Sequence, residues 1–199
     1  VIMTTSCIPG EGKTFVAANL AMSLALLGKR VIVVGLDIRK PRLVALFGLK
    51  PTKLGIVNFL CGSEPDYELL ESQIIPSGIH KNMDVLPAGI IPPNPAELLS
   101  GSMLKDAIKY LSSKYDYVLL DTPPVGLVSD TLTIGASANL TIMVTRADYS
   151  LKANFELINT LSREKKLPNC NIVLNGVDMS KRRHASHYGH YGHYGHYGH

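Results

Sequence analysis

Short apolar runs alternate with longer amphipathic stretches along most of the chain. The apolar runs have the length of β-strands, and those at 31–36, 118–120 and 140–145 contain no charged residue, as expected of strands that are buried on both faces of a sheet. They lie at 1–5, 31–36, 118–120, 140–145 and 172–174. Residues 14–27 and 155–165 instead repeat apolar positions at helical spacing. Strands that alternate with helices predict an α/β fold, with a parallel sheet and helices on both faces.

The first predicted helix has a candidate core stripe and a clear end. Phe15, Ala18, Met22 and either Ala25 or Leu26 recur at helical spacing, and the helix is expected to stop at Gly28.

The middle of the chain is less regular. We expect a short helix at 56–60, a loop at 87–95 because that segment contains four prolines, and another short helix from about residue 96.

Composition favours one folded domain followed by a tail. The 199 residues are 46% hydrophobic and 18% charged, which is typical of a globular domain, and no boundary is evident before residue 178. Residues 187–199 repeat His-Tyr-Gly four times and close on His, with no aliphatic side chain to bury. We therefore predict one folded domain at 1–178 and a flexible, tyrosine-rich tail at 179–199.

Charge, cysteines and hydropathy limit the possible partners and the cellular compartment of the protein. The net charge of +4 is spread along the chain, which argues against a nucleic-acid partner. Three well-separated cysteines, Cys7, Cys61 and Cys170, favour a reducing compartment. No apolar run approaches the roughly 20 residues that span a bilayer, so this part is expected to be soluble. Because the chain opens directly on an apolar strand, we expect it to be a piece of a longer polypeptide.

The strongest chemical signal is a candidate phosphate-binding loop at 6–14, between the first strand and the first helix. Its glycines let backbone N–H groups turn toward phosphate oxygens, and the helix N-terminus adds positive potential. Lys13 can reach the β- and γ-phosphates and Thr14 can bind Mg²⁺. Cys7 stands where the usual pattern has its first glycine. The competing interpretation is a glycine-rich turn with a surface lysine.

Two aspartates follow predicted strands. Asp121 ends an apolar run, and Asp37 follows another, with Arg39 two residues later. Because ligands bind at the carboxyl ends of parallel strands, we expect both carboxylates beside the phosphate loop, where they can hold a metal. Either aspartate alone also fits a helix cap or a turn.

These segments together resemble the bacterial tyrosine kinases of capsule and exopolysaccharide synthesis. The resemblance lies in the phosphate loop at 9–14, the acidic motif at 37–41, the Asp-Thr-Pro-Pro at 121–124 and the proline-rich loop at 92–99. Asn175 resembles the strand-end asparagine that contacts adenine in related ATPases. The tyrosine-rich tail completes the match.

The resemblance implies an ATP-dependent protein-tyrosine autokinase that uses Mg²⁺. In this family a neighbouring subunit of a ring phosphorylates the tail in trans. A transmembrane activator region, a tyrosine phosphatase and a place at the cytoplasmic face of the inner membrane are further implications. The implied catalytic residues are Lys13, Asp37, Asp121 and Arg39; the nucleotide-binding residues are Pro9, Gly10, Glu11, Gly12, Lys13, Thr14, Phe15 and Asn175; the metal ligands are Thr14, Asp37 and Asp121; and the phosphoacceptors are Tyr188, Tyr191, Tyr194 and Tyr197.

The chain departs from the family pattern, and other functions stay open. Gly35 stands where the family usually has a further aspartate, and the family's upstream subunit-contact motif would precede residue 1. The alternatives are a positioning-type ATPase, although Ile8 replaces its extra lysine, and a nucleotide-dependent assembly switch. For the tail, the alternatives are a flexible end without a role and a set of histidines that binds metal.

Overall fold

The computed structural model describes residues 1–180, which form a seven-stranded sheet in the order β3-β4-β2-β5-β1-β6-β7. All neighbouring strands are parallel except β3, a short edge strand that pairs antiparallel with β4. The predicted parallel sheet is therefore confirmed, with one antiparallel addition. The strands are β1 (Ile2–Ser6), β2 (Val31–Gly35), β3 (Ile75–Pro76), β4 (Met83–Leu86), β5 (Tyr117–Asp121), β6 (Leu140–Arg146) and β7 (Cys170–Asn175).

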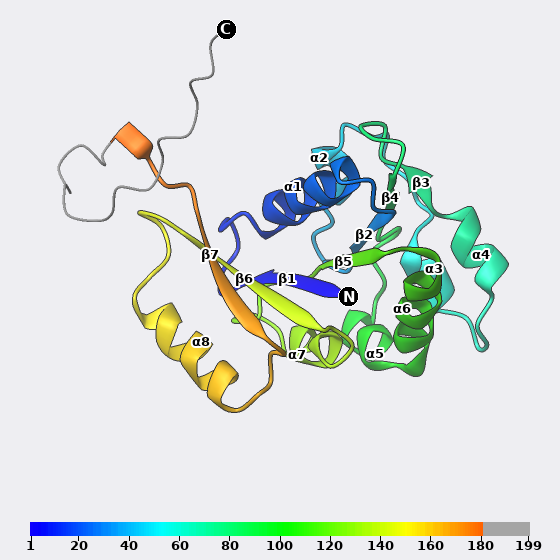
Figure 1. Ribbon diagram of the computed structural model, residues 1–199. Coiled ribbons are helices and arrows are strands. Elements are labelled where there is room, and N and C mark those ends of the chain that lie inside the picture. Colours follow the sequence, from blue (N-terminus) through cyan, green and yellow to red (C-terminus); the bar gives the residue numbers. More distant parts are fainter. Residues whose placement is uncertain (181–199) are drawn as a thin grey trace, which may run out of the picture.

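Helices cover both faces of this sheet (Figure 1), as the alternating pattern predicts. One face packs against α1 (Lys13–Leu26) and α2 (Leu43–Leu46), and their buried residues form one core cluster with β2, β4 and β5. The opposite face carries a larger core cluster. Its helices are α3 (Ile56–Leu60), α4 (Tyr67–Ser72), α5 (Pro95–Ser100), α6 (Ser102–Lys114), α7 (Asp130–Gly135) and α8 (Ala153–Arg163).

The core stripe of α1 differs from the predicted one. Its buried residues are all alanines, at 17, 18, 21 and 25, whereas Phe15 is 53% exposed and Leu26 is 65% exposed. Small side chains let this helix lie close to β1, β2 and β5, so the bulky residues are placed on its outer side.

Several elements between residues 43 and 135 were not predicted. β4 reads Met-Asp-Val-Leu, so Asp84 interrupts the apolar run that would indicate a buried strand. In α6 the signal was present, because Leu104, Ala107, Ile108 and Leu111 follow helical spacing and are buried. The predicted helices at 56–60 and near residue 96 are confirmed as α3 and α5.

The strand order brings the carboxyl ends of β1, β2 and β5 together. β5 lies between β1 and β2, and Asp121 at its end pairs in register with Thr4 on one side and Gly35 on the other. The Asp121 carbonyl accepts hydrogen bonds from the backbone N–H groups of Leu36 and Asp37, at 2.8 and 3.0 Å. The phosphate loop and both acidic motifs therefore meet at one edge of the sheet.

The tail tyrosines Tyr188, Tyr191, Tyr194 and Tyr197, and most of the predicted tail at 179–199, lie outside the described residues. Within residues 1–180, no helix combines the length and the apolar character needed to cross a membrane.

Candidate nucleotide-binding site

The segment between β1 and α1 has the backbone shape of a phosphate loop. Gly10 and Gly12 adopt left-handed conformations, with φ angles of 88° and 97°, which side chains other than glycine rarely tolerate. Gly12 is the residue that caps the N-terminus of α1. These turns direct the loop toward the start of the helix, where unpaired N–H groups and the helix dipole favour a bound anion.

The outer carbonyls of this loop are held by side chains from distant segments. The Tyr149 hydroxyl donates to the Pro9 carbonyl at 2.9 Å, and the Arg146 Nη1 group donates to the Gly10 carbonyl at 3.1 Å. The Asn175 Nδ2 group donates to the Glu11 carbonyl at 3.0 Å. Sequence reasoning missed Arg146 and Tyr149; their one local signal is that they end or follow strand β6, beside the ligand-binding edge of the sheet.

The side chain of Glu11, a predicted nucleotide-binding residue, braces the loop from inside. Its side chain is fully buried and does not line the cavity described below. One carboxylate oxygen accepts a hydrogen bond from the Ile8 backbone N–H at 2.9 Å, and the other accepts one from the Ser150 hydroxyl. The carboxylate therefore shapes the loop from within.

Lys13 joins the two predicted acidic residues. Its ammonium lies 2.9 Å from the Asp37 carboxylate and 3.4 Å from the Asp121 carboxylate. Burial raises the pKa of Asp121 above its ordinary value, and the neighbouring Asp37 charge adds to the rise, while Lys13 and a hydrogen bond from Thr14 oppose it. The charged form of Asp121 is therefore costly in this site unless a cation accompanies it.

The donor set fits Mg²⁺. Two carboxylates and the Thr14 hydroxyl converge on one ammonium group, so the site already carries the negative charge that a divalent cation would neutralise. No cluster of three or more His, Cys, Asp or Glu residues suited to a metal occurs within residues 1–180. Magnesium in phosphoryl-transfer sites is commonly held by one or two carboxylates together with the phosphates of the substrate.

An open cavity of about 780 Å³ lies above these groups. Its size suits a nucleotide-sized ligand. Of the residues that the sequence predicted to bind nucleotide, Glu11 and Asn175 do not line it. The predicted site residues that do line it are Pro9, Gly10, Gly12, Lys13, Thr14, Phe15, Asp37 and Arg39.

Arg39 forms an ion pair that the sequence did not reveal. Its guanidinium bonds the carboxylate of Asp130, which is 6% exposed in the first turn of α7. Arg39 follows β2 and Asp130 ends the loop that follows β5, so the pair connects the two loops that carry Asp37 and Asp121. Thr131 supports the same loop by donating to the Pro123 carbonyl at 2.9 Å.

We expect Arg39→Ala and Asp130→Ala to be strongly coupled in their effects on stability. Removing either residue leaves the other charge without its opposite charge, so the coupling energy should be about 1–3 kcal/mol. Urea unfolding of both single variants and the double variant measures it. The pair of Arg30 and Asp116, exposed and 3.8 Å apart, is the matched control and should give a coupling close to zero. Additive effects at Arg39 and Asp130 would contradict the ion pair.

Two departures from the family pattern have structural explanations. Cys7 replaces the first glycine of the loop, but its side chain is 1% exposed and belongs to the core cluster, so the position faces away from the phosphates. Burial raises the pKa of Cys7 to about 11, which keeps the thiol neutral and unreactive. A side chain at Gly35 would meet the Ala88 backbone nitrogen at 3.3 Å, so the room for a further carboxylate is narrow.

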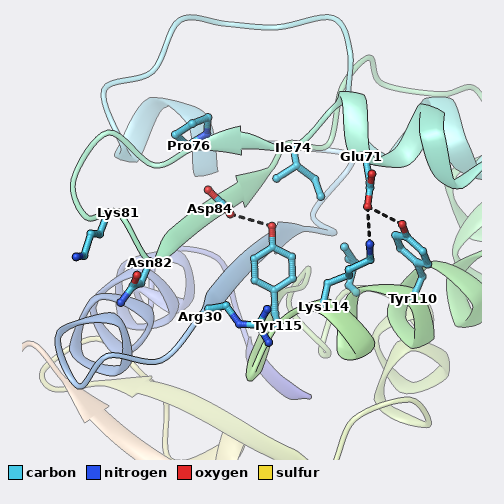
Figure 2. A pocket seen from close by; sticks show the side chains of 11 residues that line it. Arg30, Glu71, Ile74, Pro76, Lys81, Asn82, Asp84, Tyr110, Lys114 and Tyr115 are labelled. Atoms are coloured by element: carbon cyan, nitrogen blue, oxygen red, sulfur yellow. Dashed lines mark hydrogen bonds and ion pairs between the residues drawn. The ribbon is translucent and has the colours of Figure 1, made fainter.

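A second cavity, of about 510 Å³, lies at the opposite edge of the sheet, between α4, α6 and the β3–β4 hairpin. Figure 2 shows two bonded sets among its lining residues: the Tyr115 hydroxyl donates to Asp84 at 2.8 Å, and Tyr110 and Lys114 both bond Glu71. Burial and the hydrogen bond to Asp84 raise the pKa of Tyr115. These groups satisfy one another, which indicates a structural role.

Comparison with known proteins agrees with this geometry. Residues 1–174 match the family described as an AAA domain. Tyrosine-protein kinase YwqD of Bacillus subtilis is 34% identical over 186 residues, which cover 94% of this chain and 74% of that protein. The chain belongs to the bacterial tyrosine-protein kinases.

Other members of this kinase family are much longer. The putative tyrosine-protein kinase EpsB of Ralstonia solanacearum is 36% identical over 89% of this chain, but the chain spans only 22% of that relative.

Solved structures support the same family and fold. The kinase domain of Escherichia coli tyrosine kinase ETK superposes with a TM-score of 0.78 at 30% identity, over 96% of this chain and 71% of that one. The septum site-determining protein MinD complexed with Mg-ADP, from Pyrococcus horikoshii, gives a TM-score of 0.70 at 26% identity over 87% of this chain and 68% of that one. The P-loop fold predicted from the sequence is confirmed.

Proposed function

We propose that this kinase domain transfers the γ-phosphoryl group of Mg-ATP to tyrosines of its own tail, carried by a neighbouring copy. The observation that carries the proposal is the Lys13 ammonium held between Asp37 and Asp121 beneath the phosphate loop. The fold neighbour that binds Mg-ADP and the relatives named as tyrosine kinases support it. The four candidate acceptors are Tyr188, Tyr191, Tyr194 and Tyr197.

In this mechanism the protein mainly positions groups and neutralises charge. The loop N–H groups and Lys13 bind the phosphates; Thr14, Asp37 and Asp121 would hold Mg²⁺, which would supply positive charge beside the transferred group. The tyrosine oxygen forms a bond to the γ-phosphorus as the bond to the ADP oxygen breaks. The hydroxyl proton passes to Asp37, because its side chain is 13% exposed and reachable, whereas that of Asp121 is 2% exposed.

The wider role follows from the family. We propose that the domain works at the cytoplasmic face of the inner membrane with a transmembrane activator region and assembles into a ring. A tyrosine phosphatase would reverse its phosphorylation. Each added phosphate brings roughly −1.5 to −2 charges, so repeated modification would make the neutral repeat at 187–199 acidic and loosen the assembly. Through that switch the kinase would regulate the synthesis and export of capsular polysaccharide or exopolysaccharide.

Intact-mass spectrometry after incubation with Mg-ATP tests the acceptors. We expect successive additions of phosphate that map to the tail and whose rate rises with protein concentration, as transfer between copies requires. A variant with all four tail tyrosines changed to phenylalanine should bind ATP and gain no phosphate, whereas Tyr117→Phe, at the amino end of β5, should behave like the parent.

Two outcomes would count against the autokinase. Phosphate addition that persists in the variant with four phenylalanines would place the acceptors elsewhere. ATP hydrolysis without any phosphate addition to the parent would favour a positioning-type ATPase or an assembly switch, the functions of the wider fold group to which the MinD neighbour points.

A further inference from the structure

Three side chains hold backbone carbonyls of the phosphate loop, and one of them, Tyr149, also lines the cavity. Tyr149, Arg146 and Asn175 each donate one hydrogen bond to a successive loop carbonyl, those of Pro9, Gly10 and Glu11. We call these three side chains the carbonyl clamp. They come from the end of β6, the turn after it and the end of β7, so the sheet itself fixes where the clamp stands.

The clamp has a direct consequence for phosphate binding. A peptide plane whose carbonyl is held by the clamp has its N–H group turned the opposite way, because the two groups lie on opposite sides of one rigid plane. Side chains of the protein itself hold three consecutive planes in this way. The loop therefore needs little ordering when phosphate arrives, and ordering costs that are met before binding strengthen affinity.

The glycines of the loop are explained by the same contacts. A Cβ atom at Gly12 would lie 2.2 Å from the Asn175 amide nitrogen, and one at Gly10 would lie 2.7 Å from the Tyr149 hydroxyl. Either atom would force the clamp away from the loop. Glycine at these positions thus provides close approach for the clamp in addition to the left-handed backbone.

Two further bonds tie the loop to the same turn. The Ser150 hydroxyl donates to the buried Glu11 carboxylate and accepts a hydrogen bond from the Arg146 backbone N–H at 2.7 Å. The Arg146 guanidinium also lies 5.3 Å from the centre of the Tyr149 ring. The clamp residues thus support one another as well as the loop.

We propose that Arg146, Tyr149 and Asn175 are positioning residues that set the affinity of the loop for phosphate groups, whatever base the nucleotide carries. The proposal rests on the proposed use of ATP, and it changes the expected role of Asn175. Its amide nitrogen is engaged by the loop and its side chain does not line the cavity. The clamp therefore strengthens the binding of any phosphate chain. A contact with adenine would instead favour ATP alone.

Binding measurements with and without a base separate the two roles. Tyr149→Phe and Asn175→Ala should each weaken binding of Mg-ATP, Mg-GTP and inorganic tripolyphosphate by a similar factor, about two- to tenfold, because each loses one hydrogen bond that orders the loop. The matched controls are Tyr117→Phe, at the amino end of the central strand β5, and Asn171→Ala, on the same strand as Asn175. Both should bind like the parent. A loss confined to Mg-ATP for Asn175→Ala would overturn the proposal.

Amide hydrogen exchange of the nucleotide-free proteins tests the clamp independently of any ligand. Both clamp variants should exchange faster at residues 8–13 than the parent, and the two controls should not. Unchanged exchange in the clamp variants would overturn the clamp. If the parent binds no nucleotide but exchange rises as expected, the clamp stands and the proposed function fails.

Discussion

Asp121→Asn is expected to stabilise the nucleotide-free protein while lowering phosphoryl transfer at least about a hundredfold. The carboxylate of Asp121 is almost fully buried, and burial raises its pKa despite the nearby Lys13. An amide has the same shape and carries no charge to desolvate, so the free energy of unfolding should rise by roughly 1 kcal/mol at neutral pH. Lys13 keeps its closer partner, Asp37. Transfer should fall because the metal site loses a carboxylate.

The pH dependence of this gain has a definite sign. Because the folded-state pKa of Asp121 lies above its ordinary value of 3.8, the folded parent binds this proton more tightly than the unfolded chain does. That contribution to stability is complete below the ordinary value and is lost as the pH rises through the folded-state pKa. The free energy of unfolding of Asp121→Asn should therefore exceed that of the parent most at neutral pH. The two free energies should converge as the pH falls.

Thermal unfolding over a pH series, alongside transfer rates, measures both effects. Asp116→Asn is the matched control, since Asp116 directly precedes the same strand at its other end and is 42% exposed. It should leave transfer intact and give no gain in stability. A lower midpoint temperature for Asp121→Asn at neutral pH would contradict the cost assigned to the buried charge.

Lys13→Ala is expected to lower transfer by about 10²–10³-fold, because the phosphates lose the ammonium that neutralises their charge. The variant should also be less stable above neutral pH, since Asp37 and Asp121 then face each other without their shared cation. Lys13 lowers the pKa of Asp121, so its removal raises that pKa further and extends the loss of stability to higher pH. Acidification should restore part of the stability.

A metal titration distinguishes this explanation from simple loss of structure. Mg²⁺ should raise the midpoint temperature of Lys13→Ala more than that of the parent, because the cation occupies a site from which the ammonium has gone. Lys29→Ala removes an exposed lysine just beyond the other end of α1 and should change neither transfer nor the response to Mg²⁺. Transfer at the parental rate by Lys13→Ala would overturn the mechanism.

The cost of the acidic pair explains why the site is arranged as it is. A buried carboxylate beside a second one is stable only with a cation, and Lys13 supplies that cation before any ligand binds. The same ammonium is the group that binds phosphates in this fold. Keeping these charged groups buried in the site lowers the stability of the folded protein, as is common in active sites.

The sequence by itself determined the class of fold and the chemistry of the site. Apolar runs without charged residues predicted strands, which β2 and β5 confirm as buried, although β7 at the edge of the sheet is largely exposed. The glycines before Lys13 and Thr14 predicted a sharp turn into a helix. Asp37 and Asp121 were placed correctly because parallel strands end at the same edge of a sheet. These inferences use local pattern and one general rule of topology, so they needed no knowledge of which strands are neighbours.

Only the tertiary structure decided what the other side chains contact. Arg146 reaches the loop across 136 positions of sequence, and Asn175 across 164. Whether Asn175 turns to the loop or to the cavity depends on where β7 lies beside β6 and how the strands twist. The exposed Phe15, the buried Glu11 and the pairing of Arg39 with Asp130 have the same origin. Side-chain partners are fixed by the packing of distant segments, and a linear pattern of polar and apolar residues does not encode that packing position by position.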